Sequence, residues 1–149
     1  MTSHAQDIAR LRVLHQLGVV SGQEVIAWAD QVIAESAKPD STLIDLSLTA
    51  PDSAYDIDQI LGILSSERDI WETMADVMPK IRERCISDRK FAPIAARFFY
   101  NISVQKQYSV PDRFSYFLSA DDDFDLAESG VLRPDEVYQR FIDNLKNEK

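Results

Sequence analysis

The sequence has little cysteine, histidine, glycine or proline. Its 149 residues include one cysteine, two histidines, four glycines and six prolines. The single Cys85 excludes an intramolecular disulfide, and with so few histidines it also excludes a conventional Cys/His zinc site. The scarcity of glycine and proline, beside many good helix formers, argues against a turn-rich β-protein.

Long apolar segments are absent as well. No run approaches the roughly 18 apolar residues of a membrane-spanning helix, and the opening residues MTSHAQDIARLR lack the apolar core of a signal peptide. We therefore expect a cytoplasmic protein that makes no membrane contact.

Catalytic motifs are also missing. His4 and His15 fall on one predicted helix, about 16 Å apart along its axis, so they cannot share a site. The sequence contains no Gly-rich phosphate loop, no Gly-x-Ser-x-Gly elbow and no His-Glu-x-x-His pair. We expect a protein that is not an enzyme and that needs no cofactor or metal. An enzyme with an unrecognised carboxylate site remains an alternative.

The sequence does contain apolar residues at helical spacing along most of its length. This periodicity predicts an all-α fold, an irregular single-domain bundle of six to eight short helices over residues 1–149, because the stripes are short and keep no heptad. The predicted helical segments are residues 3–17, a helix following Ser21, 53–64, 66–85, 91–104, 112–120, a short piece over 123–129, and 134–145. Residues 42–48 are ambiguous, because residues 44–48 alternate like a half-buried strand; since nothing else in the chain offers a partner strand, a short helix is the preferred interpretation.

Several of these helices have sequence signals at their ends. Ser21 and Glu24 fit a capping box, and Ser66 is predicted to cap the fifth segment. Pro79 should kink or break that segment near Asp76. Residues 18–25 and 130–137 share a pattern of glycine, two apolar residues, and later Glu-Val, which indicates one kind of tight helix-to-helix corner used twice.

Two of the predicted apolar stripes are described by their residues. In residues 91–104 the stripe comprises Phe91, Ile94, Ala95, Phe98 and Ile102, with Phe99 beside it. In the segment that begins at residue 112 the stripe fails where Asp121 replaces an apolar residue, so that helix is predicted to end there.

The acidic run Asp121, Asp122, Asp123 and Asp125 is the most unusual local feature. Its spacing begins like a calcium loop, but Leu126 and Leu132 stand where that loop needs Gly and Glu. A solvated loop that caps a helix is one interpretation. The other is a site that binds a cationic partner, and these four residues are our predicted partner-binding site.

Charge is unevenly distributed along the chain. Residues 77–106 hold seven Lys and Arg against two Asp and Glu, whereas the whole chain has a net charge of −9. The basic cluster in this centre is predicted to form internal ion pairs with the acidic flanks; it comprises Lys80, Arg82, Arg84, Arg89 and Lys90. The net charge argues against nucleic-acid binding and mildly for a basic protein partner.

In size, acidity and lack of a signal peptide or catalytic motif, the chain resembles the small cytosolic immunity proteins of bacterial toxin systems. The segment LGVVSGQEVIAWADQVI is also similar to the opening of small bacterial helical proteins. Immunity proteins neutralise a toxin domain, often a nuclease, by covering its active site. The resemblance implies a non-enzymatic inhibitor of a basic toxin. The alternative is a structural helical module that forms a homodimer.

Overall fold

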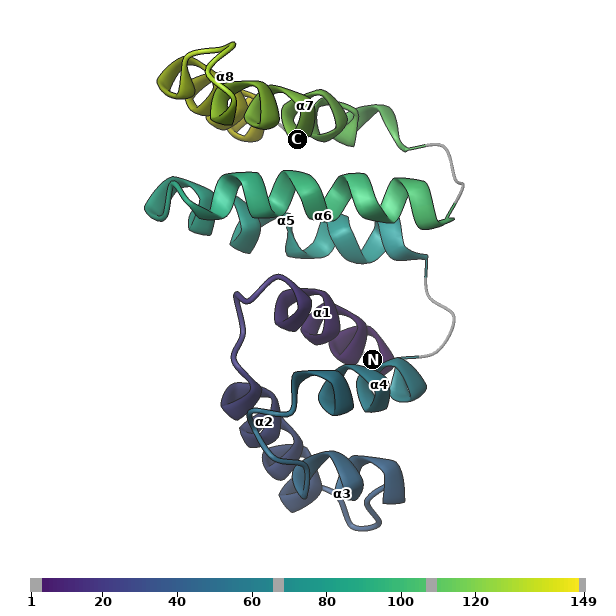
Figure 1. Ribbon diagram of the computed structural model, residues 1–149. Coiled ribbons are helices and arrows are strands. Elements are labelled where there is room, and N and C mark those ends of the chain that lie inside the picture. Colours follow the sequence, from purple (N-terminus) through teal and green to yellow (C-terminus); the bar gives the residue numbers. More distant parts are fainter. Residues whose placement is uncertain (1–3, 66–68, 107–109, 148–149) are drawn as a thin grey trace. The chain divides into compact units, whose positions relative to one another are not determined.

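The computed structural model describes residues 4–65, 69–106 and 110–147. This part of the chain holds eight α-helices and one 3-10 helix and contains no strand, which confirms the predicted all-α bundle and its number of helices (Figure 1). The residues group into two compact units, 1–77 and 78–149. Each unit is described by itself below, and the single domain over residues 1–149 stays a prediction.

The first unit is built from α1 (His4–Gln16), α2 (Gly22–Glu35), α3 (Ser41–Ser47), α4 (Ala54–Leu64) and the beginning of α5 (Ile70–Ser87). In Figure 1, α1 lies beside α4, and α2 lies beside α3. Their apolar stripes meet in one core, in which the fully buried residues include Val25, Ala29, Leu46, Ile57 and Leu61. Residues 44–48 alternate like a strand, but all except Leu48 lie in α3, which agrees with the preferred helical interpretation. The described chain holds no strand with which they could pair.

A polar contact also joins α1 to α4. Arg12 donates to both carboxylate oxygens of Asp58, at 3.0 and 3.1 Å, and Gln16 donates to the same group at 2.7 Å. Burial alone would raise the pKa of Asp58, but these hydrogen bonds and the charge of Arg12 outweigh it, so the pKa lies below its ordinary value. Asp58 is therefore held ionised between the two helices.

The second unit consists of the end of α5, α6 (Phe91–Lys106), the 3-10 helix η1 (Asp112–Phe114), α7 (Tyr116–Glu128) and α8 (Pro134–Asn147). Helix α7 packs against both α6 and α8. Aromatic rings fill the space between them. The rings of Phe99 and Phe117 stack with centroids 3.7 Å apart, and Phe141 meets Phe117 edge-on at 5.4 Å.

Two corners between helices have the same backbone geometry, as the repeated pattern predicted. Gly18 and Gly130 have φ values of +79° and +85°, a region that glycine adopts without a Cβ clash. After Gly18, the amides of Val19 and Val20 both donate to the carbonyl of Leu14. After Gly130, the amides of Val131 and Leu132 donate in the same way to the carbonyl of Leu126.

The predicted helix ends are largely confirmed. Ser21 and Glu24 form the full capping box at the start of α2, and Pro134 begins α8. The prediction for Ser66 lies outside the described residues. Of the predicted kink or break near Asp76, the break is wrong, because α5 runs through Pro79 as one helix, and the kink stays a prediction. Pro79 lies on the exposed side, while Met78 and Ile81 keep the buried stripe continuous around it.

The predicted stripe of α6 needs one correction. Ile94 is 53% exposed and Phe98 is only half-buried, whereas Ala92, Ala96 and Phe99 are buried. The buried face of α6 is therefore rotated towards its alanines. Ile94 is left on the surface beside a cavity.

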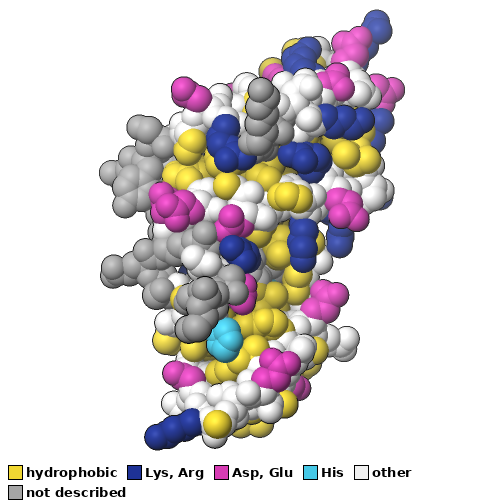
Figure 2. Space-filling view, turned by 180° about the vertical axis from the view of Figure 1, so that it is seen from behind, with side chains coloured by type: hydrophobic (Ala, Val, Ile, Leu, Met, Phe, Trp, Pro, Cys, Tyr) yellow, Lys and Arg dark blue, Asp and Glu magenta, His cyan; other side chains and the backbone are white. Residues whose placement is uncertain are grey.

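Opposite charges are mixed on one face of the molecule. On the face shown in Figure 2, Lys and Arg side chains lie interspersed with Asp and Glu, and apolar side chains show between them. Some of these opposite charges on the chain form ion pairs. Arg89 pairs with Asp135, which confirms the predicted internal pairing for one member of the basic cluster. Arg82 instead donates to the backbone carbonyl of Leu145 at 2.9 Å.

Candidate functional site

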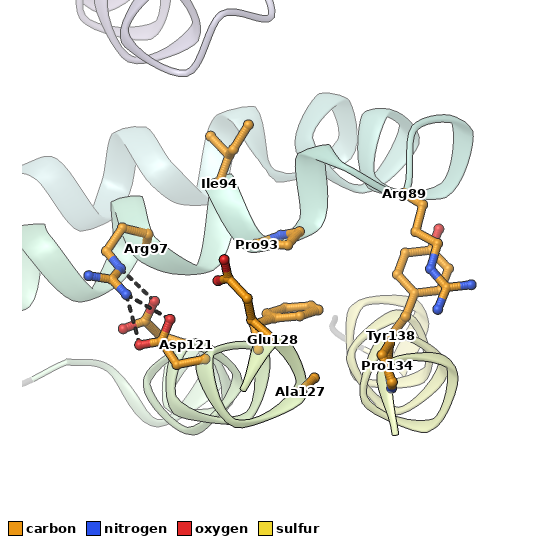
Figure 3. Close-up of a pocket in the computed structure, with 11 residues that line it drawn as sticks. Arg89, Pro93, Ile94, Arg97, Asp121, Ala127, Glu128, Pro134 and Tyr138 are labelled. Atoms are coloured by element: carbon orange, nitrogen blue, oxygen red, sulfur yellow. Dashed lines mark hydrogen bonds and ion pairs between the residues drawn. The ribbon is translucent and has the colours of Figure 1, made fainter. Parts of the chain in front are cut away.

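A cavity of about 560 Å³ lies in the second unit, lined by residues of α6, α7, α8 and the connection between α5 and α6 (Figure 3). This volume falls within the range of roughly 300–1,000 Å³ that is common for ligand-binding clefts. Most of the lining is apolar or aromatic, and comes from Pro93, Ile94, Phe124, Ala127, Pro134 and Tyr138. The charged lining residues are Arg89, Arg97, Asp121, Asp125 and Glu128.

Helix α7 supplies its side of the cavity through a single helical face. Asp121, Phe124, Asp125 and Glu128 are spaced at i, i+3, i+4 and i+7, so they project from the same side of the helix. The face is therefore acidic at both ends, with an aromatic ring between. Phe124 is held in place by the ring of Phe141, which it meets edge-on at 5.4 Å.

One end of the cavity is closed by an ion-pair cluster. Arg97 of α6 donates through Nε to Asp121 at 2.8 Å and through its terminal nitrogen to both oxygens of Asp125, at 2.9 and 3.1 Å. The hydrogen bond and charge of Asp121, followed by the charge of Asp125, raise the pKa of Arg97. The side chain of Asp121 is only 7% exposed, which a carboxylate tolerates when it is paired and hydrogen-bonded.

The other end of the cavity is built around Tyr138 of α8. Its hydroxyl donates to the backbone carbonyl of Cys85 at 2.6 Å, which ties α8 to the end of α5. Burial is the first cause that raises the pKa of Tyr138. The guanidinium of Arg89 lies 4.8 Å from the ring centroid, in cation–π range, and it also pairs with Asp135.

Glu128 differs from the other charged groups of the cavity. Asp121 and Asp125 share Arg97, and Arg89 pairs with Asp135. In the part of the chain that the structure describes, no ion pair or hydrogen bond engages the carboxylate of Glu128. Figure 3 shows this carboxylate pointing from α7 across the cavity towards Pro93 of α6. It is the one charged lining residue that a ligand would meet uncompensated, among the described residues.

The four predicted partner-binding residues lie in a helix rather than a loop. Asp121 does not end its helix, and the predicted break at this residue is wrong, because Arg97 satisfies the buried carboxylate. Asp125 lies with Asp121 at the cavity, while Asp123 pairs with Arg140 of α8 at 3.4 Å. Asp122 is exposed. The capping-loop interpretation is therefore also wrong, and the role of these residues in partner binding stays a prediction.

Sequence reasoning did not identify Phe124, Glu128 or Tyr138 as site residues. The signal for the first two was present in the spacing of residues 121, 124, 125 and 128, but it can be recognised only if one helix runs through Asp121. Tyr138 and Arg89 come together through the packing of α8 on the end of α5, which no local pattern indicates.

The one thiol of the chain, that of Cys85, lies inside the second unit. Cys85 is fully buried, and this burial raises the pKa of its thiol to about 12, so it stays protonated and unreactive. Among the described residues no group of three or more His, Cys, Asp or Glu could hold a metal ion. No helix within the same ranges is long and apolar enough to cross a bilayer.

Comparisons with known proteins place the chain in no family. No protein-family model matches it, and neither the curated proteins nor the solved structures contain a match.

Proposed function

We propose that the chain is a non-enzymatic binding protein of the inhibitor or immunity kind, which neutralises a basic protein partner. The observation that carries the proposal is the cavity beside α7, whose lining is largely apolar but holds three carboxylates against two arginines. Apolar area supplies affinity in a protein interface, while complementary charge speeds encounter and excludes wrong partners.

The geometry changes which carboxylates should meet the partner. Asp121 is buried under Arg97, so it stabilises the fold and has little surface to offer. Asp122 and Glu128 are exposed and have no ion-pair partner within the described ranges. We therefore assign the outward-facing acidic surface of α7 to these two residues, together with the exposed side of Asp125.

A capture experiment tests this assignment. The tagged protein is immobilised, exposed at low salt to lysate of the organism that encodes it, and eluted with a salt ramp. We expect a basic protein to elute at high salt from the wild type, and to be lost from the double variant Asp122→Lys and Glu128→Lys. A purified partner then gives the affinities by calorimetry.

The matched control is Asp30→Lys with Asp52→Lys. Both residues are exposed, lie in the first unit and form no ion pair in the described structure, so the change in net charge is the same. Equal losses of binding in the two double variants would mean that total charge, rather than the surface of α7, attracts the partner. An empty eluate from the wild type would contradict the proposal itself.

Exposed apolar side chains in the first unit favour a second candidate function, a module that associates with copies of itself. Leu48, Tyr55 and Ile63 are 79%, 75% and 73% exposed, respectively. Association would remove this apolar area from water.

A further inference from the structure

We propose that the cavity beside α7 receives a lysine or arginine side chain from an apolar segment of the partner, with the cation on Glu128. The inference rests on the proposed function, since it names the chemistry by which the partner would be recognised. The occupant has an apolar stem that covers the apolar lining of the cavity, including Phe124, and a positively charged head.

The shape and lining of the cavity suit such an amphipathic side chain. Its volume of about 560 Å³ exceeds what one apolar side chain needs, so a neighbouring apolar residue of the segment can enter as well. Phe124 is fixed against Phe141, and Ile94 is 53% exposed at the cavity. An aliphatic stem laid against the apolar lining of the cavity would bury apolar area that is now in contact with water.

Charge complementarity selects the head group. The lining holds two arginines and three carboxylates, a formal net charge of −1. Both arginines are already paired, Arg97 with two carboxylates and Arg89 with Asp135. A cation is therefore the group that finds a partner without breaking an existing contact, and that partner is Glu128.

The same arrangement disfavours the other classes of occupant. An anion would have to displace Asp121 or Asp125 from Arg97, and it would then face the negative charge of Glu128. A purely apolar group would exclude water from Glu128 and leave its carboxylate without a partner, which costs free energy. Only an apolar stem with a cationic head both packs against the apolar lining and gives the carboxylate of Glu128 an ion-pair partner.

Three capped dipeptides of similar size test the inference without any knowledge of the partner. They are acetyl-Leu-Lys, acetyl-Leu-norleucine and acetyl-Leu-Glu methylamides, titrated into the ¹⁵N-labelled full-length protein. We expect the lysine probe to shift amide resonances of α6, α7 and α8 around the cavity. It should bind about three- to fivefold more tightly than the norleucine probe, as one partly exposed ion pair allows.

Two substitutions distinguish the effect of the Glu128 carboxylate on binding from the effect of the total charge of the protein. In Glu128→Gln the preference for lysine over norleucine should fall to about onefold, because the carboxylate that makes the ion pair is gone. In Asp30→Asn, which removes the same charge from α2, the preference should stay as in the wild type. The amide spectrum of each variant reports whether the fold is intact.

Three results would overturn the inference: equal binding of the lysine and norleucine probes, tighter binding of the glutamate probe, or shifts that avoid the cavity. The outcome is independent of the capture experiment. A lysine preference without a captured protein would leave the cavity cation-selective and contradict the inhibitor function, whereas a captured partner without the preference would contradict only the occupant named here.

Discussion

At the scale of single residues, Asp121 is the one charged residue that is buried among the residues that the structure describes. It stands in the apolar stripe of α7, 5% exposed, and it is accommodated there because Arg97 donates to it from α6. Asp121, hydrogen-bonded to Arg97, thus occupies a buried position that an apolar residue such as leucine would fill in an ordinary amphipathic helix. Removing one partner of such a contact leaves a buried polar group unsatisfied, which costs more than the contact contributes.

Three isosteric substitutions should therefore differ in effect although each removes one negative charge. We expect Asp121→Asn to lower the free energy of unfolding by about 1–2 kcal/mol, since a buried hydrogen bond to a charged group is weakened. Asp125→Asn should cost less than about 1 kcal/mol, because the side chain of Asp125 is 58% exposed. Asp122→Asn should change stability by less than about 0.5 kcal/mol. Urea unfolding followed by circular dichroism measures all three, and a loss for Asp122→Asn as large as for Asp121→Asn would contradict this order.

Asp121 also explains why the sequence predicted only part of the cavity lining. The acidic run was recognisable as unusual, and two of its members do line the cavity. When a carboxylate interrupts an apolar stripe, a prediction from sequence ends the helix at that residue. Arg97, which pairs with the carboxylate of Asp121, lies 24 residues away, so no local pattern indicates the pairing. With the helix divided, Phe124 and Glu128 fell in a separate short segment, and the shared face of α7 could not be seen.

At the scale of secondary-structure elements, helix starts and corners were the most predictable features. Their signals are local: the hydroxyl of Ser21 accepts from the amide of Glu24, and glycine is required where φ is positive. The orientation of α6 was less predictable. Apolar residues occur on all sides of this helix, so periodicity alone could not show that the alanines would be buried and that Ile94 would be exposed.

The first turn of α2 is closely packed against the connection between α3 and α4. A Cβ on Gly22 would lie 1.8 Å from the backbone carbonyl oxygen of Pro51, which cannot move without shifting the connection. Alanine ordinarily favours a helix by up to about 1 kcal/mol over glycine. Here we expect the opposite sign.

Gly22→Ala should lower the free energy of unfolding by about 1–3 kcal/mol, the usual cost of overpacking. Gln23→Ala, an exposed change at the next position of the same turn, serves as the control and should stay within about 0.5 kcal/mol of the wild type. Thermal unfolding measures the difference. A more stable Gly22→Ala protein would mean that α2 and the connection are not in contact.

At the scale of the whole molecule, composition was sufficient to predict the fold class. Few glycines and prolines, many helix formers and repeated apolar stripes left an all-α bundle as the only architecture that fits, and the structure confirms it. The division into two compact units could not be predicted, because the predicted break at Pro79 does not occur and α5 continues through the point where one unit gives way to the other.

Net charge bears on the oligomeric state. Each copy carries a charge of −9, and repulsion between like charges opposes association. We therefore expect the mass of one chain by size-exclusion chromatography with light scattering at low salt. A dimeric mass that falls to that of one chain in the variant Leu48→Ser, Tyr55→Ser and Ile63→Ser would contradict this expectation and favour the self-associating module.

The two corners at Gly18 and Gly130 have the same backbone geometry, although the helices that follow them begin with different residues. Ser21 precedes α2 and forms a capping box with Glu24, whereas Arg133 occupies the equivalent position before α8 and Pro134 follows it. The backbone hydrogen bonds are nevertheless the same in both corners. The direction in which the chain leaves each corner is therefore encoded by the closing turn of the preceding helix. The opening turn of the next helix is free to vary, so evolution could exchange its chemistry without redirecting the chain.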